Sequence, residues 1–197
     1  MVKVGVIGVQ GAVSEHIEAV KKAMEKLGVS GSIFWLKKPE QLKEIDAIII
    51  PGGESTTISK LMIKNGLFDA VKKLGEEGVP IMGTCAGLIM LSKEVIGATQ
   101  EQKFLGLLEI KVNRNAYGRQ VESFEAVLKL AFSPEPFIGV FIRAPKIVEL
   151  LSDKVKPIAW LGDRVVGVEQ KNLIGLEFHP ELTEDTRLHE YFLKKAL

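Results

Sequence analysis

Residues 79–91 read VPIMGTCAGLIML and contain the single cysteine of the chain, Cys85. A strand-like apolar run leads into Gly83-Thr84-Cys85-Ala86-Gly87, and a second apolar run with helical character leaves it. This order predicts a strand, a sharp turn and a helix, with one reactive side chain lifted clear of the sheet edge. Small residues beside the cysteine fit a tight turn whose backbone comes close to a substrate. The segment therefore predicts an α/β fold with Cys85 as a candidate nucleophile.

Strands and helices alternate through the first half of the chain. Apolar residues from Val13 to Leu27 repeat at helical spacing, and Gly28 is a typical helix stop. Segment 46–50 is almost continuously apolar, as in a strand covered on both faces. The alternation predicts a mostly parallel, doubly wound sheet with helices on both faces. The expected strands are 3–9, 32–36, 46–50 and 79–83, and the expected helices are 13–27, 55–63, 67–76 and the segment after Cys85.

The second half of the chain has a different pattern of predicted secondary structure. Strand-like segments follow one another with short turns, which predicts an antiparallel or mixed extension of the same sheet. We expect one domain, residues 1–197. We also expect a terminal helix with Thr183 as its N-cap, Glu184 and Asp185 in its first turn and Lys194-Lys195 in its last. The expected strands are 107–112, 123–130, 137–142, 157–161, 164–169 and 173–178.

The bulk composition narrows the possible function. The 197 residues are 26% charged and 46% hydrophobic, with a net charge of +1, so nothing in the overall charge favours nucleic acid or an anionic membrane as a partner. No apolar stretch approaches the ~20 residues of a membrane helix, and nothing resembles a secretory leader. A single cysteine forms no internal disulfide, and with three histidines it makes a structural zinc site improbable. We expect a cytoplasmic protein without metal or cofactor.

His179-Pro180-Glu181 supplies a candidate base and a carboxylate to orient it. His179 follows an apolar strand-like segment, so it should face the edge where open α/β sheets bind ligands. A small buried hydrophobe is the alternative for Cys85, but a helix start and a nearby histidine both favour the thiolate. His16 and His189 fall in expected helices, where a solvated or capping role is more common.

Pro51-Gly52-Gly53-Glu54-Ser55 directly follows the apolar segment 46–50 and opens a helix. Glycines there expose backbone amides, which can hold an anion or complete an oxyanion hole together with the amide of Ala86. The segment lacks the Gly-Lys-Ser/Thr ending of a nucleotide-binding loop, and a plain tight turn is the alternative. Arg114 and Arg143 each end a strand-like run, where a guanidinium can bind a carboxylate. Gln10-Gly11 should lie at the same edge.

These motifs together resemble the triad-type (class I) glutamine amidotransferases, which share the Pro-Gly-Gly turn, the Gly-x-Cys-x-Gly elbow and the His-Pro-Glu. Within them the chain is most similar to the glutaminase subunits of pyridoxal 5′-phosphate synthase. Tyr117 and Glu122 stand where Phe and Asp are also frequent in that family. The matching segments span nearly the whole chain: Gly8-Val9-Gln10-Gly11-Ala12 with Glu15-His16, Pro51-Gly52-Gly53-Glu54-Ser55-Thr56-Thr57, Gly83-Thr84-Cys85-Ala86-Gly87, Arg114-Asn115-Ala116-Tyr117-Gly118-Arg119-Gln120, Ser123-Phe124-Glu125, Phe141-Ile142-Arg143-Ala144-Pro145 and Phe178-His179-Pro180-Glu181-Leu182.

The resemblance implies a flavodoxin-like fold and hydrolysis of L-glutamine to glutamate and ammonia through a γ-glutamyl thioester. It implies a barrel-shaped synthase subunit as protein partner in a hetero-oligomer, which uses the ammonia to make pyridoxal phosphate and activates the glutaminase on docking. The implied residues are Cys85, His179 and Glu181 for catalysis, Gly52, Gly53, Glu54, Arg114, Ile142 and Arg143 for glutamine binding, and Gly53, Ala86 and Gln10 for the oxyanion hole and its activation.

Three other functions compete with this reading. A glutaminase serving another synthase, such as that of imidazole glycerol phosphate, is disfavoured by the Gln-Gly-Ala and Ile-Arg-Ala-Pro segments. A cysteine peptidase or chaperone of related fold is disfavoured because the candidate carboxylate follows the histidine by two residues. A non-enzymatic regulatory binder would not need all three residues of a triad.

Overall fold

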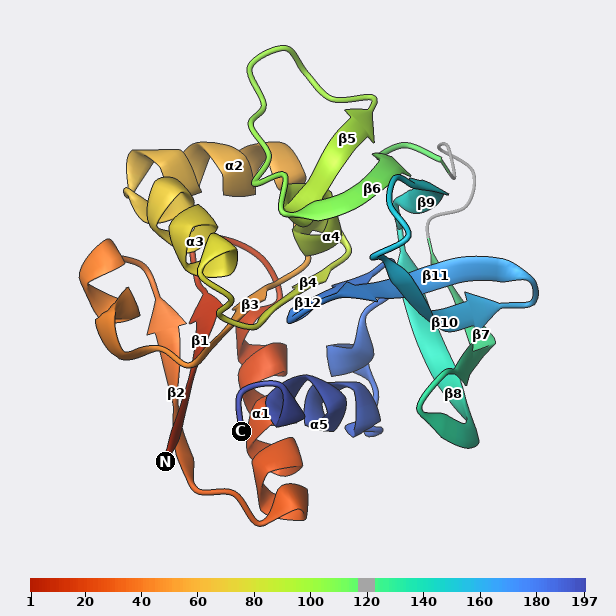
Figure 1. Ribbon diagram of the computed structural model, residues 1–197, viewed down its shortest axis with the longest axis horizontal. Coiled ribbons are helices and arrows are strands. Elements are labelled where there is room, and N and C mark those ends of the chain that lie inside the picture. The colour runs from red at the N-terminus through yellow and green to blue at the C-terminus, as the bar shows by residue number, and fades with distance from the viewer. Residues whose placement is uncertain (117–122) are drawn as a thin grey trace.

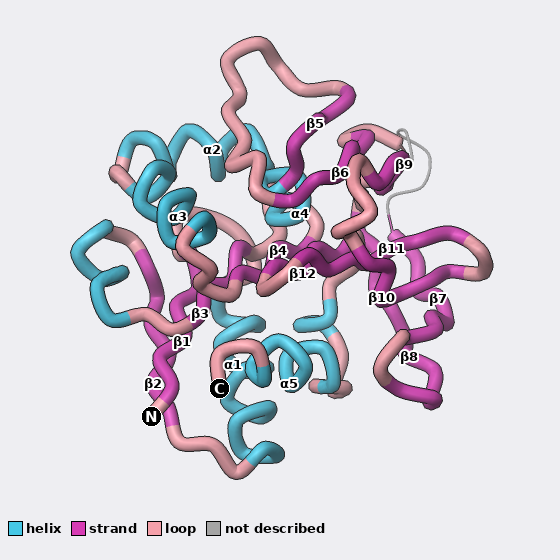
Figure 2. Tube along the Cα trace, in the orientation of Figure 1, coloured by secondary structure: helices cyan, strands magenta, loops and turns pink. Residues whose placement is uncertain are grey.

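The computed structural model describes residues 1–116 and 123–197, which build a nine-stranded sheet, a three-stranded sheet and the helices around them (Figures 1 and 2). The nine-stranded sheet has the order β2-β1-β3-β4-β12-β11-β10-β7-β8. Its strands are β1 (Val2–Ile7), β2 (Gly31–Leu36), β3 (Ala47–Ile50), β4 (Ile81–Thr84), β7 (Ser123–Leu130), β8 (Ser133–Ile142), β10 (Lys156–Leu161), β11 (Arg164–Gln170) and β12 (Leu173–Leu176).

The first five strands of this order pair in parallel and form the flavodoxin-like part of the sheet. All residues of β3, β4 and β12 are buried, because helices cover both faces at the centre. Parallel strands end at a common edge, so the carboxyl ends of β4 and β12 bring Cys85 and His179 to the same side of the molecule. The sequence-based prediction of an α/β, mostly parallel sheet is confirmed.

The helices form two layers. The helices α1 and α5 pack together on one face, and α2, α3 and α4 cover the other (Figure 1). Each layer buries its own hydrophobic cluster: Val20, Met24 and Phe192 belong to the first, and Ile58, Met62 and Val71 to the second. The bounds are α1 (Val13–Leu27), α2 (Ser55–Lys64), α3 (Leu67–Glu76), α4 (Ala86–Leu91) and α5 (Arg187–Lys194), with short 3-10 turns η1 (Pro39–Glu44) and η2 (Pro180–Leu182).

The prediction for the second half is right for most strands and wrong for one. The strands β11, β10, β7 and β8 extend the sheet in antiparallel fashion, but β6 (Leu108–Asn113) leaves it and joins a separate sheet of order β5-β6-β9. Its partners β5 (Ser92–Ile96) and β9 (Lys146–Leu150) were not predicted. Alternating burial along β6 tells that one face is covered, but not which strand lies beside it.

The terminal helix also differs from its prediction. Thr183 ends η2, and α5 begins only at Arg187, after the non-helical residue Thr186. The Thr183 hydroxyl donates to the carbonyl oxygen of Pro180 at 3.2 Å, so it serves the His-Pro-Glu turn and caps no helix. Lys194 does lie in the last helical turn.

A buried carboxylate ties the two sheets together. Glu177 is fully buried after β12, and its Oε1 accepts the backbone N–H of Ile147 in β9 at 2.7 Å. Both its oxygens accept the Arg164 guanidinium at 2.8 Å. Burial nevertheless raises the pKa of Glu177 to about 7, since it outweighs the opposing charge of Arg164.

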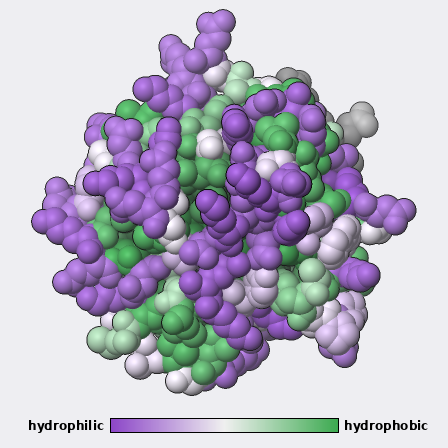
Figure 3. All heavy atoms as spheres, viewed as in Figure 1, coloured by the Kyte–Doolittle hydropathy of each residue, from purple (hydrophilic) through white to green (hydrophobic). Residues whose placement is uncertain are grey.

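Hydrophilic residues spread over the face drawn in Figure 3, with smaller hydrophobic areas between them. Among the described residues, no helix is long and apolar enough to cross a membrane. The segment from Tyr117 to Glu122, including the Tyr-Gly-Arg-Gln part of the family motif, lies outside the described residues.

The glycines of the elbow allow close packing of backbone. A Cβ at Gly87 would overlap the carbonyl oxygen of Ile50 in β3, and one at Gly83 would overlap the carbonyl of Gly87. Neither glycine has a positive φ, whereas Cys85 between them does. These two glycines therefore let α4 sit directly on the sheet, a packing role that differs from the predicted close approach to substrate.

We predict that Gly87→Ala lowers the free energy of unfolding by about 1–3 kcal/mol, because the rigid Ile50 backbone cannot yield to the added methyl group. Gly75→Ala in α3 is the matched control. Its Cβ would meet only side-chain methyls of Leu107 and Ile81, and alanine gains about 1 kcal/mol of helix propensity. Denaturant unfolding of both variants measures the difference. Equal stability of the two would show that α4 can shift without cost.

Candidate active site

Cys85 occupies a strained turn between β4 and α4. Its φ of 53° and ψ of −106° place a non-glycine residue in a region that costs about 1–3 kcal/mol. Its backbone N–H donates to the carbonyl oxygen of Leu176 in β12 at 2.9 Å, which holds the turn. The side chain is buried, and its Sγ lies 3.7 Å from the carbonyl oxygen of Ile142. Ala86 opens α4, so its amide is one of the first-turn donors that have no intrahelical acceptor.

His179 and Glu181 lie on the turn that follows β12. The Nδ1 of His179 and the Oε1 of Glu181 are 2.6 Å apart, and both residues are buried. The backbone N–H of His179 donates to Val140 of β8 at 2.8 Å, which fixes the turn against the antiparallel part of the sheet. The second nitrogen of the imidazole is therefore not engaged by Glu181, and Cys85 lies close enough to raise the pKa of His179.

The neighbouring groups of this cluster stabilise the charged forms of His179 and Glu181. Burial would lower the pKa of His179, but hydrogen bonds to Cys85 and Glu181 outweigh it and raise that pKa to about 10. Burial would raise the pKa of Glu181, but neighbouring His16 and His179 lower it. At neutral pH the arrangement is therefore a carboxylate beside a protonated imidazole.

The Gly-Gly turn after β3 lies directly against these side chains. A Cβ at Gly52 would overlap the His179 ring and lie 3.4 Å from the Cβ of Cys85. The carbonyl oxygen of Gly52 accepts the N–H of Ala12 at 3.2 Å. Gly53 has a φ of 155°, and a Cβ there would overlap Oε1 of Gln10. Only glycine fits at these two positions while the turn keeps this shape.

Gln10 and Glu54 anchor the same turn. The Oε1 of Gln10 accepts the backbone N–H of Glu54 at 2.9 Å. The Glu54 carboxylate caps α2 by accepting the N–H groups of Thr56 at 3.0 Å and Thr57 at 2.7 Å. Burial would raise the pKa of Glu54, but hydrogen bonds from Thr57 and Thr56 lower it to about 2.

Arg114 reaches the Gly-Gly turn from the end of β6. Its Nη2 donates to Oε1 of Glu54 at 2.9 Å, and its Nη1 to Oε1 of Gln102 at 3.4 Å. Gln102 also donates to the hydroxyl of Ser55 at 3.0 Å. Sequence reasoning missed Gln102, because it lies in a loop without a recognisable motif.

Arg143 lies directly after the end of β8. It has a positive φ of 44°, and it directly follows Ile142, whose carbonyl oxygen faces Cys85. Both residues are exposed. The structure thus brings the Gly-Gly turn, Gln10, Arg114 and the carbonyl oxygen of Ile142 together around Cys85 and His179.

The prediction for the other two histidines is wrong. His16 and His189 are fully buried, with His16 Nδ1 and His189 Nε2 2.9 Å apart. His16 Nε2 lies 3.0 Å from Thr84 Oγ1 and 3.4 Å from Glu181 Oε2. No sequence pattern predicts this contact, because helical periodicity does not tell which two helices share a buried face.

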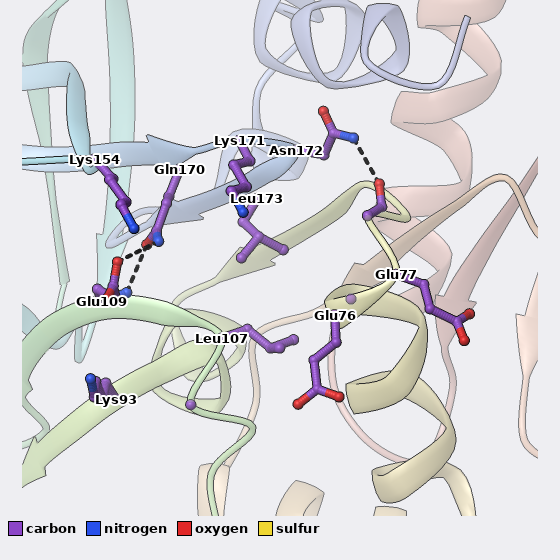
Figure 4. Close-up of a pocket in the computed structure, with 13 residues that line it drawn as sticks. Glu76, Glu77, Lys93, Leu107, Glu109, Lys154, Gln170, Lys171, Asn172 and Leu173 are labelled. Atoms are coloured by element: carbon purple, nitrogen blue, oxygen red, sulfur yellow. Dashed lines mark hydrogen bonds between the residues drawn. The ribbon is translucent and has the colours of Figure 1, made fainter. Parts of the chain in front are cut away.

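One hollow, between α1 and the turn after β12, includes Glu181 in its lining, and another lies away from the cluster. A cavity of about 590 Å³ opens beside the starts of β4 and β12, which is the sheet edge opposite to Cys85 (Figure 4). In it Gln170 bonds to Glu109, and Asn172 donates to the carbonyl oxygen of Gly78. Within the described ranges, no group of three or more His, Cys, Asp or Glu side chains is arranged to hold a metal ion.

Relatives in other organisms match the whole chain. A chain named "Pyridoxal 5′-phosphate synthase subunit PdxT" from Thermococcus gammatolerans is 83% identical over 100% of both chains. Proteins of the same name from Pyrococcus furiosus and Methanopyrus kandleri are 76% and 47% identical to it. The two alignments cover 100% and 98% of this chain, respectively, and 100% of each relative.

Solved structures agree with these relatives. A crystal structure described as a glutamine amidotransferase superimposes with a TM-score of 0.86 and 48% identity over 98% of both chains. The structure of PurLQS from Thermotoga maritima, with a TM-score of 0.65 and 16% identity over 99% of this chain and 94% of its own, shares the fold. The model of the SNO glutamine amidotransferase family matches residues 6–197. The chain therefore belongs to the SNO glutamine amidotransferase family.

Proposed function

We propose that this glutamine amidotransferase is the glutaminase subunit of a pyridoxal 5′-phosphate synthase. It hydrolyses L-glutamine with Cys85, His179 and Glu181 and delivers the ammonia to the synthase subunit. The observation that carries the catalytic part is the convergence of these three side chains, with the His179–Glu181 contact of 2.6 Å, beside the strained turn of Cys85. The proposal takes residues 1–197 as one glutaminase domain.

In the first half of the reaction, the Cys85 thiolate attacks the side-chain amide carbon of glutamine. The amides of Ala86 and Gly53 stabilise the oxyanion, and one such donor contributes about 3 kcal/mol. The C–N bond then breaks as His179 gives its proton to the leaving nitrogen, which departs as ammonia. The product on the enzyme is a γ-glutamyl thioester.

In the second half, neutral His179 takes a proton from water as that water attacks the thioester carbon. The C–S bond breaks, glutamate leaves and Cys85 returns to the thiolate. Glu181 keeps the imidazole oriented and stabilises its positive charge through both halves. The pKa of His179 of about 10 supports this role in the resting enzyme, because its protonated form is the one that gives a proton to the departing amide nitrogen.

Glutamine itself is proposed to lie between the Gly-Gly turn and the end of β8. Gly52, Gly53 and Glu54 form one wall, and Ile142 and Arg143 the other. Arg114 is placed to bind the α-carboxylate of glutamine or to shape its site by holding Glu54, because its guanidinium already contacts Glu54 at 2.9 Å.

The partner is proposed to control the Gly-Gly turn through Gln10. The Gln10 side chain and the Ala12 amide hold the turn from the β1–α1 loop. A synthase subunit docking on that loop would therefore act directly on Gly53 and its amide. Glycine at both positions of the turn allows a peptide to rotate at low cost.

We predict that Cys85→Ser lowers ammonia release by about 10³-fold or more in the presence of the synthase subunit, because the attacking thiolate is lost. The substitution keeps side-chain size, so the melting temperature should stay close to that of the parent. Undiminished ammonia release from a folded Cys85→Ser protein would rule out Cys85 as the nucleophile.

Arg114→Ala should raise the KM for glutamine by about tenfold or more and change kcat much less, since one charge-assisted hydrogen bond is worth about 1.5–3 kcal/mol. Steady-state kinetics in the assembled complex measure both constants. Arg187→Ala, whose guanidinium pairs with Asp185 away from the site, is the matched arginine control. An unchanged KM in Arg114→Ala would reject the binding role.

Gln10→Ala should reduce the activation of the glutaminase by the synthase subunit more than it changes glutamine KM, because it removes the side chain that holds the Glu54 amide. The measurement is ammonia release with and without the synthase subunit for both proteins. Glu18→Ala, on the exposed side of α1, controls for an altered docking surface. Full activity of the isolated parent chain would contradict partner control altogether.

A further inference from the structure

Two buried histidines that the proposed chemistry does not use lie directly behind the candidate triad. His16 comes from α1 and His189 from α5, and both side chains have no exposed surface. Their rings meet at 2.9 Å between His16 Nδ1 and His189 Nε2. Burying a pair of polar rings in the centre of a hydrophobic helix layer costs free energy unless their nitrogens are hydrogen-bonded.

The other side of His16 reaches both ends of the candidate triad. Its Nε2 lies 3.0 Å from the hydroxyl of Thr84, the residue before Cys85, and 3.4 Å from Oε2 of Glu181. The Glu181 Oε1 atom is the one that meets His179 at 2.6 Å. His16 is therefore the group that faces the carboxylate oxygen which His179 does not use.

The direction of the hydrogen bond between His16 and His189 follows from the groups at the outer nitrogen of each ring. If His189 Nε2–H donates to His16 Nδ1, the proton of His16 is on Nε2 and points at Thr84 and the Glu181 carboxylate. The buried His189 Nδ1, which has no partner among the described residues, is then only a lone pair.

The reverse polarity places two unfavourable groups inside the protein. His16 Nε2 would direct a lone pair at the Glu181 carboxylate, and His189 Nδ1 would carry a buried N–H without an acceptor. The first polarity is therefore the stable one, with both rings neutral.

The charges around the pair agree with neutral rings. Burial lowers the pKa of His16. The nearby carboxylates of Glu181 and Glu15 oppose this shift, and the charge of His179 adds to it. Burial, with His16 beside it, lowers the pKa of His189 to about 3 although Glu181 opposes this.

We infer that His16 is a positioning residue for the glutaminase reaction, and that His189 fixes the tautomer in which the Nε2–H of His16 donates to Thr84 and lies 3.4 Å from the Glu181 carboxylate. The inference rests on the proposed function, since His16 acts through Glu181. Oε2 of Glu181 is buried without a hydrogen-bond partner among the described residues, so the nearby N–H of His16 attracts it and favours the rotamer that presents Oε1 to His179. Outer partners of this kind orient functional side chains in many sites.

The first experiment reads the tautomers directly in the full-length protein. The chain has only three histidines, so ¹⁵N-histidine labelling gives a simple spectrum that His16→Leu and His189→Leu assign. At pH 7.5 the inference expects neutral rings with the proton on Nε2 in both His16 and His189. A proton on Nδ1 of His16, or an imidazolium at that position, overturns it.

The second experiment measures glutaminase kinetics in the complex with the synthase subunit. His16→Leu should lower kcat by about 10- to 100-fold and leave the glutamine KM unchanged, as for loss of an outer-shell partner. His16→Gln keeps an N–H near the position of Nε2 and should recover part of that loss. His189→Leu should have a smaller effect than His16→Leu.

Val20→Ala is the structural control, because it removes buried volume from the same helix layer without touching a polar group. A kcat of His16→Leu equal to that of Val20→Ala overturns the inference. If His16→Leu does not fold, an unchanged kcat in both His16→Gln and His189→Leu overturns it instead. Retained activity of Cys85→Ser in the same assay identifies failure of the proposed function, which is a separate result.

Discussion

The strained backbone of Cys85 is the constraint on which the rest of the site depends. A φ of 53° at a non-glycine residue persists only where neighbours fix it, and here the hydrogen bond from the Cys85 N–H to the Leu176 carbonyl oxygen does so. The close packing of α4 on β3 requires Gly83 and Gly87. The turn that presents the sulfur is thus a product of sheet geometry and backbone contact, and its cost is offset by the buried core on both faces.

Backbone amides and carboxylates, more than long side chains, hold the structure around that turn. The Gly52 carbonyl and the Glu54 amide are both held by the β1–α1 loop, through Ala12 and Gln10. Glu54 in turn holds the start of α2 and the Arg114 guanidinium. Three separate parts of the chain therefore meet on one short turn, so a movement of any one of them reaches the proposed oxyanion hole.

Beneath the pocket, polar side chains continue into the α1–α5 layer. This row of side chains extends from Cys85 and His179 through Glu181 to His16 and His189, and every member is buried. Glu177 makes a second buried connection, from the strand that precedes His179 to β9. Such networks fix single rotamers because each member would lose its partner on moving. The connections through Glu181 and Glu177 therefore hold the segment that carries the candidate base, His179.

The amino-acid sequence by itself determined the parallel α/β sheet, most element boundaries and the edge at which Cys85, His179 and Glu54 gather, because apolar periodicity and glycine turns are local signals. It did not determine the three-stranded sheet of β5, β6 and β9, the late start of α5 or the burial of His16 and His189. Those features depend on which surfaces meet after the chain has folded. A histidine on a helix has the same local sequence signal whether it faces water or another helix, and only the packing of α1 against α5 decided between them.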